Sequence, residues 1–98
     1  IGINNISSEV PNEYRLSQNY PNPFNPVTKI EFALPVTENV TIRIYDAAGS
    51  EVSTIVNQKL NAGVYSVDWD ASVNPSGVYF YQLRAGNYAE TKRMILLK

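Results

Sequence analysis

Two residue types are missing from this 98-residue sequence, cysteine and histidine. Without cysteine the chain can form neither a disulfide nor a thiolate metal site, and its redox compartment cannot be inferred from cysteine usage. Without histidine it lacks the usual general base, the commonest metal ligand and every Ser/His or Cys/His nucleophile pair. We therefore predict a non-enzymatic domain with no catalytic residue, no metal site and no cofactor.

Long apolar runs and an excess of positive charge are also lacking. No apolar run approaches the roughly 18 residues of a membrane-spanning helix. The first residues, "IGINNISSEVP", show neither the basic start nor the apolar stretch of a signal peptide. The net charge of −1 argues against a nucleic-acid partner, which would require a basic surplus. A hydrophobic fraction of 44% over this length indicates one globular domain, and the abrupt start leads us to expect a longer precursor.

Prolines are concentrated in the stretch "YPNPFNP", which we call the proline corner. Its residues are Tyr20, Pro21, Asn22, Pro23, Phe24, Asn25 and Pro26. A proline lacks the backbone N–H and fixes φ, so this stretch can be neither an interior helix nor a central strand. Because aromatic rings are costly to leave in water, we expect Tyr20 and Phe24 to pin the corner to the domain edge. We expect Asn22 and Asn25 to satisfy backbone groups through Asx-turns.

Six segments carry the signals of β-strands: residues 29–34, 40–45, 52–56, 64–70, 78–84 and 89–98. In the first two, apolar β-branched and aromatic residues alternate with polar ones, which is the period of a half-buried strand. The segment "VYFYQLR" is apolar on both faces, as in the middle of a sheet. No helical periodicity is present, so the predicted fold class is all-β. We predict an immunoglobulin-like antiparallel β-sandwich of about seven strands, without a disulfide and anchored by Trp69.

Two aspartates, Asp68 and Asp70, flank Trp69 on one face of a predicted strand. At the rise of a strand they lie roughly 7 Å apart, a separation found in inverting glycosidases. Together with Asp46 they could also bind calcium, which takes oxygen ligands, although the spacing of an EF-hand is absent. A solvated strand face explains the same residues more simply, and so small a sandwich has little room for the cleft that acid catalysis needs.

Seven tyrosines are present. Exposed tyrosines such as Tyr14, Tyr45 and Tyr88 could form a platform on which sugar rings stack. The chain would then be an accessory carbohydrate-binding module of an extracellular enzyme. More often, tyrosines in a sandwich are half-buried with only the hydroxyl in water. The sequence by itself leaves this alternative open.

Five stretches, in order, resemble the type A C-terminal sorting domain of type IX secretion in Bacteroidetes and their relatives. They are "LSQNYPNPFNPVTKIEFALP", "VTIRIYDAAGSEV", "LNAGVYSVDWD", "PSGVYFYQLRAG" and "TKRMILLK". The proline corner and the pattern P-x-G-x-Y-x-x-x-L, formed by Pro75, Gly77, Tyr79 and Leu83, are specific parts of this resemblance. The middle of the chain is also similar to the immunoglobulin-like domain of flagellar hook-capping proteins, which supports the sandwich.

The resemblance implies a delivery label. Proteins of this kind reach the periplasm by a signal peptide, and an outer-membrane translocon recognises their C-terminal domain. A sortase-like peptidase then removes that domain, and the cargo is attached to anionic lipopolysaccharide at the cell surface or released. Here the resemblance implies a sorting domain over residues 16–98. Residues 1–15, polar and without a strand pattern, would be the linker from an upstream cargo domain and would contain the cleavage point.

In this family the sorting information lies mainly in the last strands, which implies a set of recognition residues. They are Gly77, Tyr79, Leu83, Lys92, Arg93, Met94, Ile95, Leu96, Leu97 and Lys98. The same residues could instead serve only to hold the sandwich together. A last strand at the sheet edge, protected from aggregation by lysines, would stay open for strand addition to a receptor or for weak dimerisation. The proline corner would fix the angle at which the linker joins the sandwich.

Overall fold

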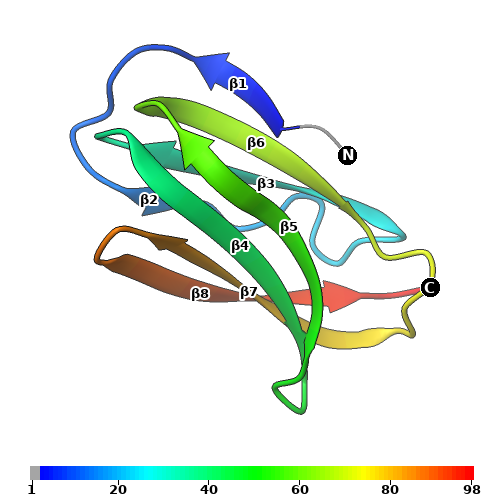
Figure 1. The fold of residues 1–98 in the computed structure, drawn as a ribbon. Coiled ribbons are helices and arrows are strands. Elements are labelled where there is room, and N and C mark those ends of the chain that lie inside the picture. The colour runs from blue at the N-terminus through cyan, green and yellow to red at the C-terminus, as the bar shows by residue number, and fades with distance from the viewer. Residues whose placement is uncertain (1–2) are drawn as a thin grey trace.

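The computed structural model describes residues 3–98, which form eight β-strands and no helix (Figure 1). The strands are β1 (Ile3–Ser7), β2 (Arg15–Leu16), β3 (Val27–Leu34), β4 (Glu38–Asp46), β5 (Glu51–Leu60), β6 (Gly63–Asp70), β7 (Gly77–Ala85) and β8 (Tyr88–Leu96). The first sheet has the order β1-β6-β3-β2 and the second β5-β4-β7-β8, and every pair is antiparallel. The predicted antiparallel β-sandwich is confirmed, with eight strands in place of about seven.

Apart from β1, the strand order is that of an immunoglobulin-like domain. β2, β3 and β6 occupy the places of strands A, B and E, while β5, β4, β7 and β8 occupy those of C′, C, F and G. β7 is a central strand, as its two apolar faces predicted, and β8 is an edge strand. Since the chain has no cysteine, no disulfide joins the two sheets.

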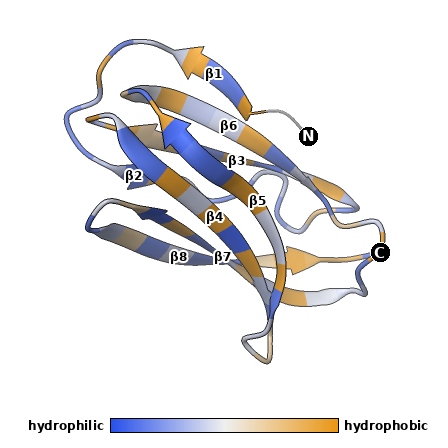
Figure 2. Ribbon diagram, viewed as in Figure 1, coloured by the Kyte–Doolittle hydropathy of each residue, from blue (hydrophilic) through white to orange (hydrophobic). Residues whose placement is uncertain are grey.

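The core lies between the sheets and follows the predicted alternation. On β3, Ile30, Phe32 and Leu34 are fully buried, whereas Lys29 and Glu31 are exposed. Figure 2 shows this alternation as successive hydrophobic and hydrophilic bands along the strands. Packing of one face of each strand against the opposite sheet therefore determines which residues form the core.

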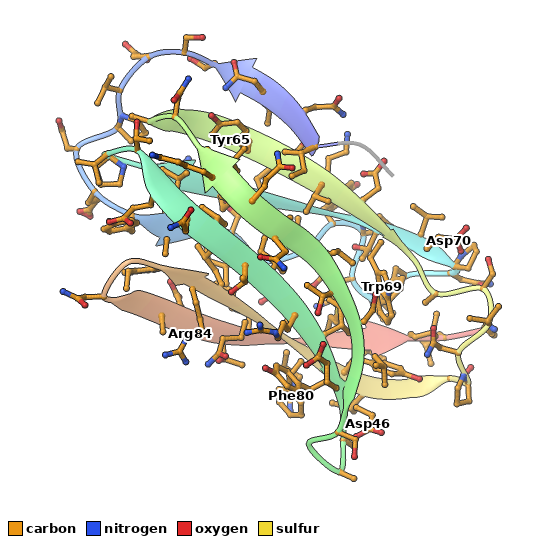
Figure 3. The ribbon with its side chains drawn as sticks, viewed as in Figure 1. Asp46, Tyr65, Trp69, Asp70, Phe80 and Arg84 are labelled. Carbon is orange, nitrogen blue, oxygen red and sulfur yellow. The ribbon has the colours of Figure 1, made fainter. Side chains whose placement is uncertain are left out.

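Trp69 on β6 is the predicted anchor of this core, and it is buried (Figure 3). Its ring centroid lies 5.9 Å from that of Phe24 and 5.5 Å from that of Tyr79. Burial of one such large side chain contributes about 2–3 kcal/mol to folding. Trp69 therefore links the proline corner to the second sheet.

The N-terminal segment departs from the prediction of an irregular linker over residues 1–15. β1 pairs with β6, and β2 pairs with β3. The polar sequence of β1 carries no strand signal. β1 forms because the edge of β6 offers unpaired backbone groups and because Ile3 packs against the core. Residues 1 and 2 of the predicted linker lie outside the described residues.

The start of β7 contains a tyrosine corner. Gly77 opens the strand with a φ of 155°, a conformation that residues with a side chain rarely adopt. Two residues later, the Tyr79 hydroxyl donates a hydrogen bond of 2.7 Å to the Pro75 carbonyl. Tyr65 makes the equivalent bond, also of 2.7 Å, at the start of β6. The pattern P-x-G-x-Y therefore builds the corner found at strand F of immunoglobulin-like domains.

We predict that Tyr79→Phe lowers the free energy of unfolding by about 1 kcal/mol, because the bond to Pro75 is lost while the ring stays packed on Trp69. Tyr45→Phe is the matched control, since the Tyr45 hydroxyl has no hydrogen-bond partner within residues 3–98. Urea unfolding followed by tryptophan fluorescence measures both variants. Equal stability of the two would contradict the structural role of the corner.

Candidate functional site

The proline corner lies against the end of β8, as the light-blue segment beside the red end of the chain shows (Figure 1). The Phe24 N–H donates to the Ile95 carbonyl, and the Leu97 N–H donates to the Phe24 carbonyl, both at 3.0 Å. Phe24 thereby forms a parallel bridge with Leu96, and its side chain is 2% exposed. The corner thus adds one residue to the edge of the second sheet.

Two side chains, Asn22 in the corner and Gln18 just before it, complete this contact. Asn22 Oδ1 accepts a hydrogen bond of 3.0 Å from the Ile95 N–H. Gln18 Nε2 donates a bond of 2.7 Å to the Arg93 carbonyl. In an antiparallel edge strand, alternate residues direct both backbone groups away from the neighbouring strand. The outward groups at the end of β8 therefore find partners in residues 18–24.

The contact between residues 18–24 and 93–97, which we call the closing seam, covers the outer edge of the last part of β8. Exposed strand edges invite pairing with other chains, and covering them with a loop prevents it. The prediction that the last strand offers an open edge to a receptor is therefore wrong between residues 93 and 97. The reason is a pairing over 73 sequence positions, from Asn22 to Ile95, which no local pattern reveals.

A buried hydrogen-bond network holds the start of the seam. The Tyr81 hydroxyl accepts from the Asn19 N–H (2.8 Å) and donates to the Ser17 carbonyl (2.7 Å). The Asn19 side-chain amide donates to Thr28 Oγ1 (2.9 Å) and to the Pro21 carbonyl (3.1 Å). The sequence analysis missed this network. Its one available signal was Thr28, a polar residue at a core-facing position of β3.

The two aromatic residues of the corner differ in exposure. Phe24 is buried as predicted, but Tyr20 is 80% exposed, so the prediction that its ring pins the corner is wrong. The Tyr20 backbone makes the attachment instead, through two bonds of 2.9 Å with the Lys29 backbone. The three X–Pro bonds of the corner are cis. Asn22 bonds to β8, and Asn25 has no side-chain hydrogen bond within residues 3–98, so neither forms the predicted Asx-turn.

The predicted recognition residues fall into three groups by burial. The buried ones are Tyr79, Leu83, Met94 and Leu96. Half-buried are Lys92 and Ile95. Exposed are Gly77, Arg93, Leu97 and Lys98. The first group holds β7 and β8 in the core, and only the other two groups can touch a partner of the folded domain.

Polar contacts hold two lysines near the end of the chain, Lys92 and Lys98. Lys92 Nζ lies 3.4 Å from Glu90 Oε2, in a half-buried ion pair at the surface that contributes little energy. At the chain end, the Lys98 N–H donates to Ser76 Oγ (2.9 Å), and Lys98 Nζ donates to the Ser72 carbonyl (2.5 Å). These bonds tie the end of the chain to the loop between β6 and β7.

Two of the three aspartates considered for catalysis or calcium binding, Asp46 and Asp70, accept hydrogen bonds within turns. Hydrogen bonds from the Ser72 hydroxyl and N–H hold the pKa of Asp70 below its ordinary value, whereas a general acid needs a raised pKa. Asp46 Oδ1, in the other sheet, accepts from the N–H groups of Ala48 (3.0 Å) and Ser50 (2.9 Å). Figure 3 shows Asp46 and Asp70 on different strands. Within residues 3–98, no three acidic, histidine or cysteine side chains cluster as a metal site would require.

The three tyrosines suggested for sugar binding do not form one platform. Tyr14 and Tyr88 stack on each other, with ring centroids 4.7 Å apart and planes at 13°, and both are half-buried. Tyr88 pairs with Ala85, and Ala85 pairs with Val40 on β4. Tyr45 lies further along β4, roughly 17 Å from that row at the rise of a strand. One sugar chain therefore has no continuous aromatic surface over these three residues.

Comparisons with known proteins add a family to this geometry. The model of the family described as the secretion system C-terminal sorting domain matches residues 18–97. A search of curated proteins finds no match. The part of the chain that the structure describes contains no helix capable of spanning a membrane. The matched range begins and ends with Gln18 and Leu97, the outermost residues of the closing seam.

We predict that Asn22→Ala accelerates hydrogen exchange at the Ile95 amide about tenfold, because that N–H loses its acceptor. The expected loss of protection is about 1.4 kcal/mol, which corresponds to a tenfold change in exchange rate. Asn25→Ala is the control, since it removes an exposed corner amide that bonds to nothing within residues 3–98. Exchange is measured by NMR on both variants. Equally slow exchange in the two would show that Asn22 does not protect the Ile95 amide.

Burial raises the pKa of Tyr81 to about 12; the bond from the Asn19 N–H opposes this rise, and the Glu90 carboxylate adds to it. An unfolded tyrosine titrates near pH 10, so from about pH 10 to about 12 only the folded chain keeps this proton. The free energy of unfolding must therefore fall as the pH rises through that range.

We predict that the free energy of unfolding of Tyr81→Phe falls less steeply over the same pH range. At pH 7 this variant should be less stable by about 1–3 kcal/mol, because the Asn19 N–H loses a buried partner. Unfolding curves that decline equally with pH in both proteins would contradict this assignment.

Proposed function

Because this chain belongs to the family of secretion system C-terminal sorting domains, we propose that it directs an upstream cargo protein across the outer membrane through the type IX translocon. Domains of this family are sorting signals of type IX secretion, and they mark a precursor for export to the cell surface or the extracellular space. The match over residues 18–97 is the observation that carries the proposal. The sandwich fold and the closing seam support it.

The closing seam gives the proposed signal a fixed shape. A receptor that recognises a folded domain needs a surface whose geometry persists, and four hydrogen bonds hold the chain end against residues 18–24. In this proposal the core residues position the strand and exposed side chains contact the translocon. The positioning residues are Tyr79, Leu83, Met94 and Leu96. The contact residues are Arg93, Leu97 and Lys98.

We place the processing site in the loop between β1 and β2. Residues 8–13 are exposed except for Pro11, and exposed loops are the preferred sites of proteolysis. A sortase-like peptidase that cuts this loop leaves the cargo joined to the sorting domain only through β1, a five-residue strand at the edge of the first sheet. After transit through the periplasm, the cargo is then released or attached to anionic lipopolysaccharide at the surface.

The proposal is tested with a signal peptide, a reporter and residues 1–98 fused in this order and produced in a bacterium that has type IX secretion. We expect the unsubstituted fusion to be exported and the export of Leu97→Ser/Lys98→Ala to be about tenfold lower. A tenfold decrease corresponds to a loss of about 1.4 kcal/mol in the free energy of recognition. Leu97 is 56% exposed, so its replacement leaves the core intact. The measurement is the ratio of reporter outside the cell to reporter in the periplasm.

The matched control is Val36→Ser/Arg15→Ala, which replaces one apolar and one basic residue at exposed positions outside the seam. We expect its export to equal that of the unsubstituted fusion. Periplasmic retention of the unsubstituted fusion would refute the sorting function. Normal export of Leu97→Ser/Lys98→Ala would show instead that the exposed chain end is not recognised.

A further inference from the structure

The outer face of the second sheet collects positive charge. On β4, β7 and β8, the residues that alternate with core residues point outward, and they include Arg43, Arg84 and Arg93. Lys59 of β5 pairs with an outward residue of β4 and shares this face. Half of the eight basic residues therefore lie here, and Glu51 is the one acidic residue on this face within residues 3–98. We call this surface the arginine face.

These positive charges are largely uncompensated. Arg43 Nε lies 3.7 Å from Glu51 Oε1 in an exposed pair, which contributes little. The guanidinium groups of Arg84 and Arg93 are exposed, and they form no ion pair or hydrogen bond within the described part of the chain. Figure 3 shows Arg84 and Phe80 directed away from the first sheet. The face therefore keeps a positive potential although the chain carries a net charge of −1.

Aromatic side chains accompany the arginines on this face. The strand register places Tyr45, Phe80 and Arg93 side by side on β4, β7 and β8, with Val78 and Ile95 in the next row. Tyr45 and Phe80 are half-buried, so part of each ring stays accessible. Arginine and aromatic residues are enriched in protein–protein interfaces and dominate their binding energy. This composition therefore indicates a protein partner.

The shape of the face leads to the same partner. A four-stranded sheet face is open. The hollows beside Val10 and Tyr20 lie on other parts of the domain, and the hollow beside Pro75 reaches this face only at Val78. Such a face suits an extended protein surface better than a small ligand. Guanidinium groups bind carboxylates through paired, charge-assisted N–H···O bonds, which makes an acidic surface the complementary one.

We propose that the arginine face docks an acidic surface of a partner protein. The inference rests on the proposed sorting function, since the partner is the component of the secretion machinery that recognises this domain. The outer face of the first sheet carries Glu31, Asp68 and Asp70 beside Arg15 and Lys29, so it has no surplus of positive charge and docking favours the arginine face. Arg93 joins the arginine face to the closing seam, and one partner can contact both.

The test compares two charge-matched variants in the reporter fusion. Arg43→Gln/Arg84→Gln removes two positive charges from the arginine face and leaves every seam residue in place. Arg15→Gln/Lys29→Gln removes two from exposed positions of the first sheet. We expect export to fall about tenfold for the first variant, through lost charge complementarity, and to stay unchanged for the second. Tryptophan fluorescence verifies that both variants are folded.

The outcomes separate this inference from the sorting function itself. Equal export of the two variants, with the unsubstituted fusion exported, would overturn the arginine face and leave the sorting function intact. Failure to export the unsubstituted fusion would overturn the sorting function and with it the identity of the partner. Loss of export for Arg43→Gln/Arg84→Gln, with normal export of Arg15→Gln/Lys29→Gln, supports the proposal.

A binding measurement on the 98-residue chain tests the chemistry of the partner. The probes are immobilised poly-L-glutamate and phosphatidylglycerol vesicles at low salt. We expect poly-L-glutamate to retain the unsubstituted chain and Arg15→Gln/Lys29→Gln, and to retain Arg43→Gln/Arg84→Gln about tenfold less. Retention by vesicles alone, equal retention of both variants, or no retention on poly-L-glutamate would overturn an acidic protein as the partner.

Discussion

The pairing of Phe24 with the end of β8 is the contact on which the rest of the structure depends. The Phe24 backbone bonds to the outward carbonyl of Ile95 and the outward N–H of Leu97. The Phe24 ring packs on Trp69, which packs on Tyr79. One residue therefore joins the proline corner, the first sheet and the second sheet. Without it, the last strand would present an unpaired edge, and the chain end would be a flexible tail instead of part of a sheet.

The chemistry of the corner explains how one loop residue can hold this position. Pro21 and Pro23 restrict φ, so the corner loses less conformational entropy on folding than a flexible loop would. They also carry no N–H that would need a partner, while Asn22 supplies an acceptor for Ile95. A folded surface built from the two ends of the family-matched segment is a more reproducible target for a receptor than a mobile tail. The neighbouring arginine face enlarges this surface and gives it a charge.

Local sequence patterns predicted the sandwich because burial of one strand face imposes alternation, and this alternation assigned Ile30 and Phe32 to the core. Trp69 was assigned to the core because it is the largest apolar side chain available to fill that core. These patterns could not predict the closing seam, since pairing between segments 73 positions apart leaves no periodic signal. Tyr20 and Phe24 look equivalent in the sequence, and only the position of β8 decides which ring is buried. The strand β1 depends in the same way on the free edge of β6.

Scalar couplings across hydrogen bonds, measured by NMR on the isotope-labelled chain, test the closing seam most directly. The structure predicts a coupling between the Phe24 amide nitrogen and the Ile95 carbonyl carbon, and another between the Leu97 amide nitrogen and the Phe24 carbonyl carbon. Both should appear together with the couplings that link β7 to β8. If the β7–β8 couplings are observed and both Phe24 couplings are absent, the chain end is not closed by the proline corner and the account is contradicted.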